Sequence, residues 1–280
     1  MDSGIETIVD SRIERQQALC RSVLYQALAL GFGPPAARTL TRLGGAAIDA
    51  LAEAAAAIDD RRNTRLEPLA MALRRCPDAG SVDRLSESRR RLFGHTARGP
   101  FSPYETEYGE DTLFQKPQEM SDIAAFLRAF GLRLDPRAGE RIDHVACEVE
   151  LMAFLSRKEA HALEIDDAIM LGETRKAARL FLKDHLGRFL PAFAGRIQDA
   201  DPEGFYGRLA ALAAALLRHD CARLQVTPGP EALRLRAPID DRAPMACGGA
   251  SGCGPASCGD GPDGGEGPDG AEGPGGGGGA

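Results

Sequence analysis

Apolar residues recur every three or four positions along most of the chain, from about residue 10 to residue 225. This spacing is typical of helices that bury one face. We find no stretch in which apolar and polar residues alternate with β-branched enrichment, the pattern that predicts a strand. The sequence therefore predicts an all-α protein with helices at residues 10–31, 36–57, 64–75, 81–93, 118–130, 143–163, 166–186, 187–199 and 204–225.

Two segments interrupt this pattern and a third ends it. Residues 95–118 hold three prolines without a clean period, and a segment this long inside a compact domain is often functional. A turn at residues 132–143 predicts a hinge between two helical halves, about 10–131 and 143–226, of one domain that spans 10–227. From residue 228 to 280 glycine and proline dominate. Such a segment cannot bury enough apolar surface to offset its ordering entropy, so we expect a disordered tail.

The predicted helix at 143–163 carries polar residues where its face should be apolar. Asp143 and His144 stand at its first turn, and Glu148 lies one turn on. Asp143 suits a helix N-cap, since a carboxylate there favours the helix dipole. His144 and Glu148 are spaced to satisfy each other as an i, i+4 pair. The other interpretation is a polar spot that lines a groove.

The long middle segment contains PYETEY, which places Tyr104 and Tyr108 four residues apart with Glu105 and Glu107 between them. In a helical turn both rings would share one face. One interpretation is a loop that plugs the core with two tyrosines. The other is an acidic, amphipathic wall for a partner peptide.

Composition narrows the function classes. The formal net charge is −7 and the pI is near 5.4, which argues against nucleic acid as the main partner. The first residues have no secretory pattern, and the longest apolar run, at 209–217, is too short for a membrane span. We expect a soluble cytoplasmic protein.

Motifs for catalysis are missing from the sequence. It has no Glu-x-x-His pair for a di-iron site, no phosphate-binding P-loop and no G-x-S-x-G elbow. A helical enzyme with His144 and Glu148 as acid and base is the weakest interpretation, because neither a nucleophile nor a metal motif accompanies them. We therefore expect no enzyme activity and no cofactor.

The tail holds Cys247, Cys253 and Cys258, whose spacing is not that of a C-x-x-C site. Three thiolates can nevertheless hold a soft metal ion. One alternative function is accordingly a metal- or cofactor-delivery protein that uses these thiols together with His144. The other interpretation is an unstructured tail with incidental cysteines.

Taken together, several stretches resemble the TorD/DmsD/NarJ family of redox-enzyme maturation chaperones, from Tyr25 to about Leu224. These stretches are LYQALALGFGPP, SPYETEYG, IAAFLRAFGL, ERIDHVACEVELMAFLSRKEA, FLKDHLGRFLPAFAGRI and FYGRLAALAAALL. The most specific is similar to the family's E-x-x-D-H hinge followed by E-L-x-F-M. Ile142 stands where a proline often precedes the Asp-His pair, and the tryptophans of many members are absent.

The resemblance implies a cytoplasmic chaperone for a molybdenum oxidoreductase of the dimethyl sulfoxide reductase superfamily. Such a chaperone binds the twin-arginine signal peptide and the apo form of the catalytic subunit before export. By this resemblance the Asp-His pair lies near the peptide groove. The implied contacts are carboxylates for the arginines and tyrosines for the apolar stretch: Glu105, Glu107, Asp143 and Glu148, with Tyr25, Tyr104 and Tyr108.

Overall fold

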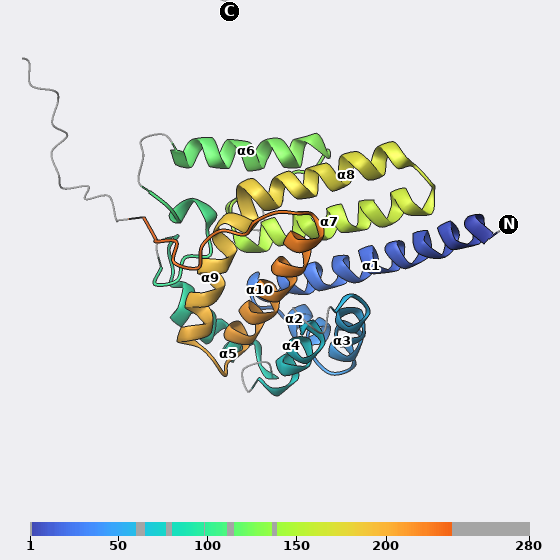
Figure 1. Cartoon of the computed structure of the whole chain (residues 1–280). Coiled ribbons are helices and arrows are strands. Elements are labelled where there is room, and N and C mark those ends of the chain that lie inside the picture. Colours follow the sequence, from blue (N-terminus) through green and yellow to red (C-terminus); the bar gives the residue numbers. More distant parts are fainter. Residues whose placement is uncertain are drawn as a thin grey trace, which may run out of the picture. The chain divides into compact units, whose positions relative to one another are not determined.

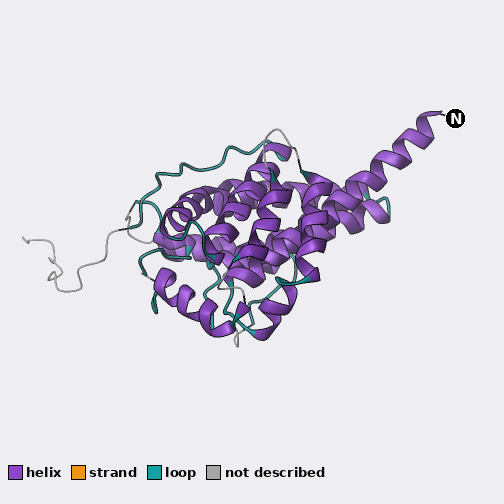
Figure 2. Cartoon of the chain, turned by 90° about the horizontal axis from the view of Figure 1, so that it is seen from below, coloured by secondary structure: helices purple, strands orange, loops and turns teal. Residues whose placement is uncertain are grey.

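The computed structural model describes residues 2–59, 65–76, 80–97, 99–110, 115–135 and 139–236. Over these ranges the chain forms helices joined by turns, with two isolated β-bridges and no strand (Figures 1 and 2). The predicted all-α class is confirmed. The helices are α1 (Asp2–Phe32), α2 (Ala37–Arg42), α3 (Ala46–Ile58), α4 (Leu66–Ala72), α5 (Val82–Phe93), α6 (Gln115–Ala129), α7 (Val145–Glu164), α8 (Ala168–Phe181), α9 (Gly187–Ala200) and α10 (Phe205–Arg223).

Shorter turns join some of these helices. Two are 3-10 turns, η1 (Leu73–Arg75) and η3 (Glu105–Glu107), and one is a π-helical turn, η5 (Leu182–Leu186), which links α8 to α9. The predicted helix at 36–57 is wrong in one respect, since the structure breaks it into α2 and α3. The break falls at Gly44 and Gly45, and the positive φ of 53° at Gly45 is a conformation that helices do not use.

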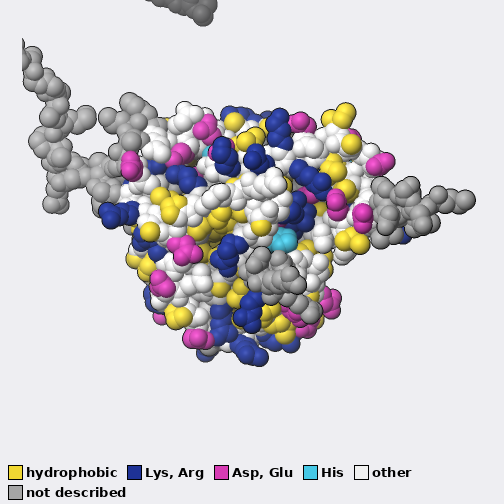
Figure 3. All heavy atoms as spheres, viewed as in Figure 1, with side chains coloured by type: hydrophobic (Ala, Val, Ile, Leu, Met, Phe, Trp, Pro, Cys, Tyr) yellow, Lys and Arg dark blue, Asp and Glu magenta, His cyan; other side chains and the backbone are white. Residues whose placement is uncertain are grey.

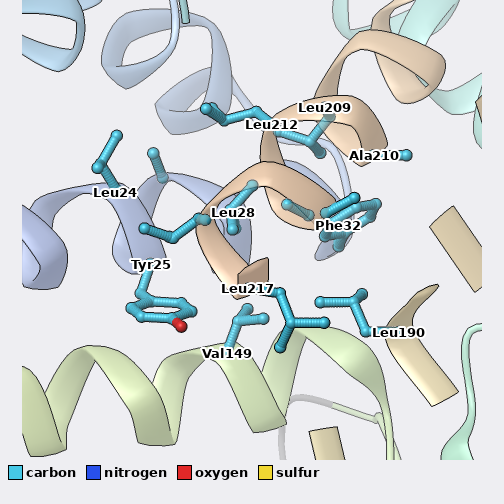
Figure 4. Close-up of a cluster of buried hydrophobic side chains, with 14 of the residues drawn as sticks. Leu24, Tyr25, Leu28, Phe32, Val149, Leu190, Leu209, Ala210, Leu212 and Leu217 are labelled. Carbon is cyan, nitrogen blue, oxygen red and sulfur yellow. The ribbon is translucent and has the colours of Figure 1, made fainter. Parts of the chain in front are cut away.

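The core lies where α1 and α7 pack side by side and α10 crosses them. Leu24, Leu28 and Phe32 of α1 are fully buried and face Val149 of α7 and the leucines of α10 (Figure 4). Leu, Phe and Ala fill most of this core. Because the three helices bury apolar side chains on almost every side, the N-terminal half of α7 has little room for exposed polar groups.

A buried ionic network joins the same helices at the opposite end of α7. The Arg21 guanidinium on α1 lies 3.0 Å from the carboxylate of Glu159 on α7 and 3.6 Å from that of Asp220 on α10. Arg223 bonds both carboxylates, at 3.2 and 3.1 Å. Tyr25 donates its hydroxyl to Asp220 at 2.9 Å. These buried charges are therefore paired, as low-dielectric surroundings require.

The C-terminal end of the described chain returns to the domain. Residues 228–236, which the sequence assigns to the tail, pack against it, and Arg236 is only 7% exposed. The rest of the predicted tail, with Cys247, Cys253 and Cys258, lies outside the described residues. The hinge at 132–143 stays a prediction.

Candidate functional site

The PYETEY segment and the start of α7 form one unit. The amide of Val145 donates to the carbonyl of Pro103 at 2.8 Å, and the amide of Glu105 donates to the carbonyl of Asp143 at 2.9 Å. An antiparallel β-bridge also pairs Tyr104 with His144. The two motifs that the sequence singled out therefore lie against each other, although 34 or more residues separate them in the chain.

Asp143 ties this unit together. Its fully buried carboxylate accepts the Thr106 hydroxyl at 2.7 Å and the Thr106 amide at 3.3 Å. The Arg141 guanidinium donates to both oxygens of the same carboxylate, at 3.0 and 2.7 Å. Asp143 is not the N-cap of α7, so that prediction was wrong by one residue. Its role in this structure is to hold η3 in place.

His144 is the N-cap. Its Nδ1 accepts the amide of Ala146 at 3.0 Å, and the ring is fully buried against the edge of Tyr104. Burial lowers the pKa of His144 to about 3, with smaller contributions from Arg89 and Arg141. The imidazole is thus neutral with its proton on Nε2, which has no hydrogen-bond partner among the described residues. The unprotonated Nδ1, the nitrogen that could bind a metal ion, already accepts the helix-capping hydrogen bond. The enclosed ring is therefore a poor metal ligand.

Glu105 is the fully buried centre of the site. His185 lies 3.2 Å from one carboxylate oxygen, and Arg188 donates to the other at 2.8 Å. Burial opposes ionisation of Glu105, but His185 and Arg188 outweigh it and lower its pKa. The π-helical turn η5 presents His185 on the same side as Arg188. Such turns re-aim side chains within a helix and occur often at functional sites.

Glu148 contrasts with its ionised neighbours. It is 1% exposed, and its carboxyl group lies beside that of Glu105 rather than beside a cation. Burial raises its pKa well above the usual value, and the nearby carboxylates of Glu105 and Asp143 raise it further. Both effects favour the protonated form of Glu148. The predicted His144–Glu148 pair was wrong, because His144 caps the helix through the Ala146 amide and Glu148 lies beside Glu105.

The remaining predicted residues have distinct surroundings. The Glu107 carboxylate lies 2.8 Å from Lys116 and 3.4 Å from Arg141. Tyr108 is fully buried and donates its hydroxyl to the carbonyl of Ser102. Tyr104 is half-buried, donates to Glu140 and lies beneath the Arg141 guanidinium. Tyr25 alone is not at this site, since it belongs to the ionic network around Asp220.

Beside this cluster lies a groove of about 720 Å³, which we call the α1–α7 groove. Apolar side chains form much of its wall: Ala29, Pro34, Leu127, Leu132, Leu134, Leu151 and Phe154. Three carboxylates also line it, those of Asp135, Glu140 and Glu150, together with the guanidinium groups of Arg38, Arg133 and Arg157. Glu140 links the groove to the cluster, because the same carboxylate accepts Tyr104 at 2.9 Å and Arg89 at 2.8 Å. The exposed Glu150 has no ionic partner among the described residues.

Other kinds of site are not evident in the described part of the chain. No group of three or more His, Cys, Asp or Glu side chains there is arranged to hold a metal ion. None of the helices over those ranges combines the length and apolar character that crossing a bilayer needs. On the face shown in Figure 3, basic side chains are interspersed with acidic ones rather than gathered into one basic surface.

Comparison with known proteins identifies the family. The sequence pattern of the nitrate reductase delta subunit matches residues 47–195, which is more than half of the chain. The chain belongs to this family. The match includes the η3 loop, the whole of α7 and the π-helical turn, and so covers every residue of the cluster around Glu105. Tyr25 and residues 228–236 lie outside it.

Among curated relatives, the chain is similar to proteins named Chaperone protein TorD. The relative from Vibrio cholerae is 31% identical over 131 residues, which is 46% of this chain and 57% of the relative. The relative from Vibrio parahaemolyticus is 28% identical over 180 residues, 64% of this chain and 74% of the relative. The chain thus spans little more than half the length of the first of these relatives. Both relatives carry the name of a chaperone, not that of an enzyme.

Several members of the site within the family match were not predicted from the sequence, among them His185, Arg188 and Arg141. His185 and Arg188 bond Glu105, and Arg141 bonds Asp143. The first two stand in FLKDHLGRF, where a histidine and an arginine three residues apart interrupt an otherwise apolar face. That interruption was a usable signal. No sequence signal pointed to Arg141. Its guanidinium donates to the Thr106 hydroxyl at 2.7 Å, a contact that depends on how the loop folds.

Proposed function

We propose that this protein is an assembly chaperone that binds the twin-arginine signal peptide and apo form of a molybdenum oxidoreductase in the cytoplasm. Family membership and the named TorD relatives support the chaperone class. The single observation that carries peptide binding is the α1–α7 groove, in which an apolar wall lies beside the exposed and unpaired carboxylate of Glu150, within a lining of mixed charge. A twin-arginine signal peptide has the complementary parts, two guanidinium groups and an apolar stretch.

Within the groove the carboxylates differ in availability. Glu140 already bonds Arg89 and Tyr104, whereas Glu150 is exposed and unpaired in the described ranges. We therefore assign the first contact with a signal-peptide arginine to Glu150. A charge-assisted hydrogen bond to a guanidinium is the strongest polar contact open to it. Phe154, half-buried on the next turn of α7, would cover the apolar stretch.

The cluster beside the groove plays a different part in this proposal. Glu105, Glu107 and Asp143 are all paired with cations of the chain itself, and burial raises the pKa of Glu148. In the closed arrangement these carboxylates hold the η3 loop against α7 and so shape one end of the groove. They meet a client directly only when this loop opens.

Calorimetry tests the proposal. The titrant is a twin-arginine signal peptide of a molybdenum oxidoreductase from the same organism, and binding should weaken as salt rises because exposed charge pairs are screened. Glu150→Lys should weaken binding roughly two- to fivefold, the scale of exposed ion pairs. The matched control is Glu173→Lys, which makes the same charge change at an exposed position on α8 outside the groove. Equal effects of the two variants would reject the groove, and no binding by the unaltered protein would reject the function.

A further inference from the structure

The described chain ends in a segment that crosses back over the domain after α10. Figure 1 shows it in orange to red, running back past α9. We call residues 229–236 the strap. At its start, the amide of Gly229 donates to the carbonyl of Gly187 at 2.8 Å. Midway, Arg196 of α9 donates to the carbonyl of Leu233 at 3.2 Å.

Gly229 fits this contact because it has no side chain. A Cβ at this position would lie 2.1 Å from the carbonyl oxygen of Arg188, far inside van der Waals contact. The backbone of α9 would have to move to admit one. The start of the strap is therefore docked closely on α9, next to the residue whose side chain bonds Glu105.

At its end the strap holds the η3 loop. The amide of Gly109 donates to the carbonyl of Arg234 at 2.9 Å, and the amide of Arg236 donates to the carbonyl of Glu107 at 2.8 Å. These two bonds flank the antiparallel bridge between Tyr108 and Leu235. The strap thus pairs with the loop through one isolated antiparallel bridge, directly after the carboxylates of Glu105 and Glu107.

The side chain of Arg236 secures this pairing. Its Nε donates to the carbonyl of Tyr108 at 3.1 Å, and its Nη2 donates to both oxygens of Glu119 on α6, at 3.2 and 3.0 Å. Glu119 also lies 3.1 Å from Arg188, which bonds Glu105. A continuous chain of ion pairs therefore runs from the strap to the centre of the site.

We propose that the strap is a closing device: it holds the loop of residues 103–109 over α7, and its detachment makes Glu105 and Glu107 available to a basic ligand. The closed state explains how Glu105, Glu107 and Asp143 are all paired with cations of the chain itself. That the ligand is a basic peptide rests on the proposed function. That the strap holds the loop does not. Arg236 is a positioning residue in this scheme, because it acts through Glu119 and the backbone of Tyr108.

Amide hydrogen exchange of the protein alone tests the closing device. We compare the full chain with a chain that ends at Thr227, which lacks the strap, and one that ends at Pro238, which keeps it. Without the strap, the amides of Tyr108 and Gly109 should exchange roughly tenfold faster or more, while those of α10 keep their protection. The chain ending at Pro238 should match the full chain. Unchanged exchange without the strap would overturn the proposal.

If the shorter chain does not fold, point variants test whether the strap holds the loop. Arg236→Ala should accelerate exchange at Tyr108 and Gly109, and Arg236→Lys should do so less, because an ammonium keeps the charge but cannot reach Tyr108 and Glu119 together. Gly229→Ala should have the same effect from the other end of the strap. Gly172→Ala is the matched control, since a Cβ there meets no atom within 4 Å. Exchange at wild-type rates in both Arg236→Ala and Gly229→Ala would reject the strap.

Peptide affinity separates this inference from the proposed function. If detachment frees the carboxylates, Arg236→Ala should bind the signal peptide more tightly, by about tenfold if the open state is populated at a tenth in the full chain. A variant that had merely lost structure would bind more weakly. Faster exchange with unchanged or weaker affinity would overturn the claim that the strap controls access. If no chain binds the peptide, the proposed function fails while the exchange result still judges the strap.

Discussion

Thr106 donates both its amide and its hydroxyl to one oxygen of the Asp143 carboxylate, at 3.3 and 2.7 Å. This pair joins the middle loop to the beginning of α7 at a fully buried point. The Asp-His motif therefore stabilises the fold and also lies beside the groove. Its loss should be visible in stability before it is visible in binding.

Asp143→Ala should lower the free energy of unfolding by about 2–4 kcal/mol, because it leaves Thr106 and Arg141 without their shared acceptor. Asp143→Asn should cost less, since its amide oxygen still accepts Thr106. Urea unfolding measures both. Asp199→Ala, which removes an exposed carboxylate on α9, is the control and should change stability by less than about 0.5 kcal/mol. A cost for Asp143→Ala as small as that of the control would contradict the assigned role.

His144 should make stability depend on pH. Its pKa of about 3 in the folded protein is below its ordinary value of 6.5, so between these values only the unfolded chain binds the proton. The free energy of unfolding should therefore fall by about 1.4 kcal/mol per unit as pH decreases through this window. The carboxylates with lowered pKa values, such as Glu105 and Glu159, act in the same direction at lower pH.

His144→Asn isolates this contribution, because asparagine also caps a helix N-terminus but does not titrate. The difference in unfolding free energy between the variant and the wild type should shrink or reverse as pH falls from 6.5 to 4.5. Parallel stability curves for the two proteins over that range would show that His144 is not held neutral.

Glu148 should have the opposite pH dependence. Its pKa is raised in the folded protein, so its contribution to stability is full at acidic pH and is lost as pH rises through the folded pKa. Glu148→Gln keeps the shape and removes the titration. The variant should gain stability relative to the wild type as pH rises above the ordinary carboxyl value of 4.5, measured by thermal unfolding between pH 4.5 and 8. A constant difference across that range would mean that Glu148 is ionised or solvated.

Substitutions of Tyr25 and Tyr104 should have different effects, the first on stability and the second on peptide binding. Tyr25→Phe removes one hydrogen bond to the buried Asp220 and should cost about 1–3 kcal/mol without changing peptide affinity. Tyr104→Phe, at the half-buried link to Glu140, should change stability less and weaken peptide binding. Calorimetry and thermal unfolding of both variants provide the comparison. Loss of binding in Tyr25→Phe at unchanged stability would restore the predicted role of Tyr25 in the groove.

The sequence predicted the helices well because helical periodicity is a local property. The break at Gly44 and Gly45 was missed, since two glycines among alanines also suit a continuous helix at some cost. The site was predicted in part: the loop and the Asp-His motif do lie together. Which partner each carboxylate takes was not predictable, because His185 and Arg188 reach Glu105 through tertiary packing and a π-helical turn. The packing of Arg236 against the domain was not predictable for a similar reason. The glycine- and proline-rich composition of this segment predicts disorder, whereas backbone hydrogen bonds to the loop hold it in place.

The most direct test of the account is to find where the signal peptide binds. A photoreactive benzoylphenylalanine at Gln26, an exposed residue that lines the α1–α7 groove, should cross-link the twin-arginine peptide on illumination. The same group at Glu203, which is exposed in the turn before α10 and does not line the groove, should not. Excess unlabelled peptide should abolish the adduct at position 26. A cross-link at position 203 but none at position 26 would contradict the assignment of the groove.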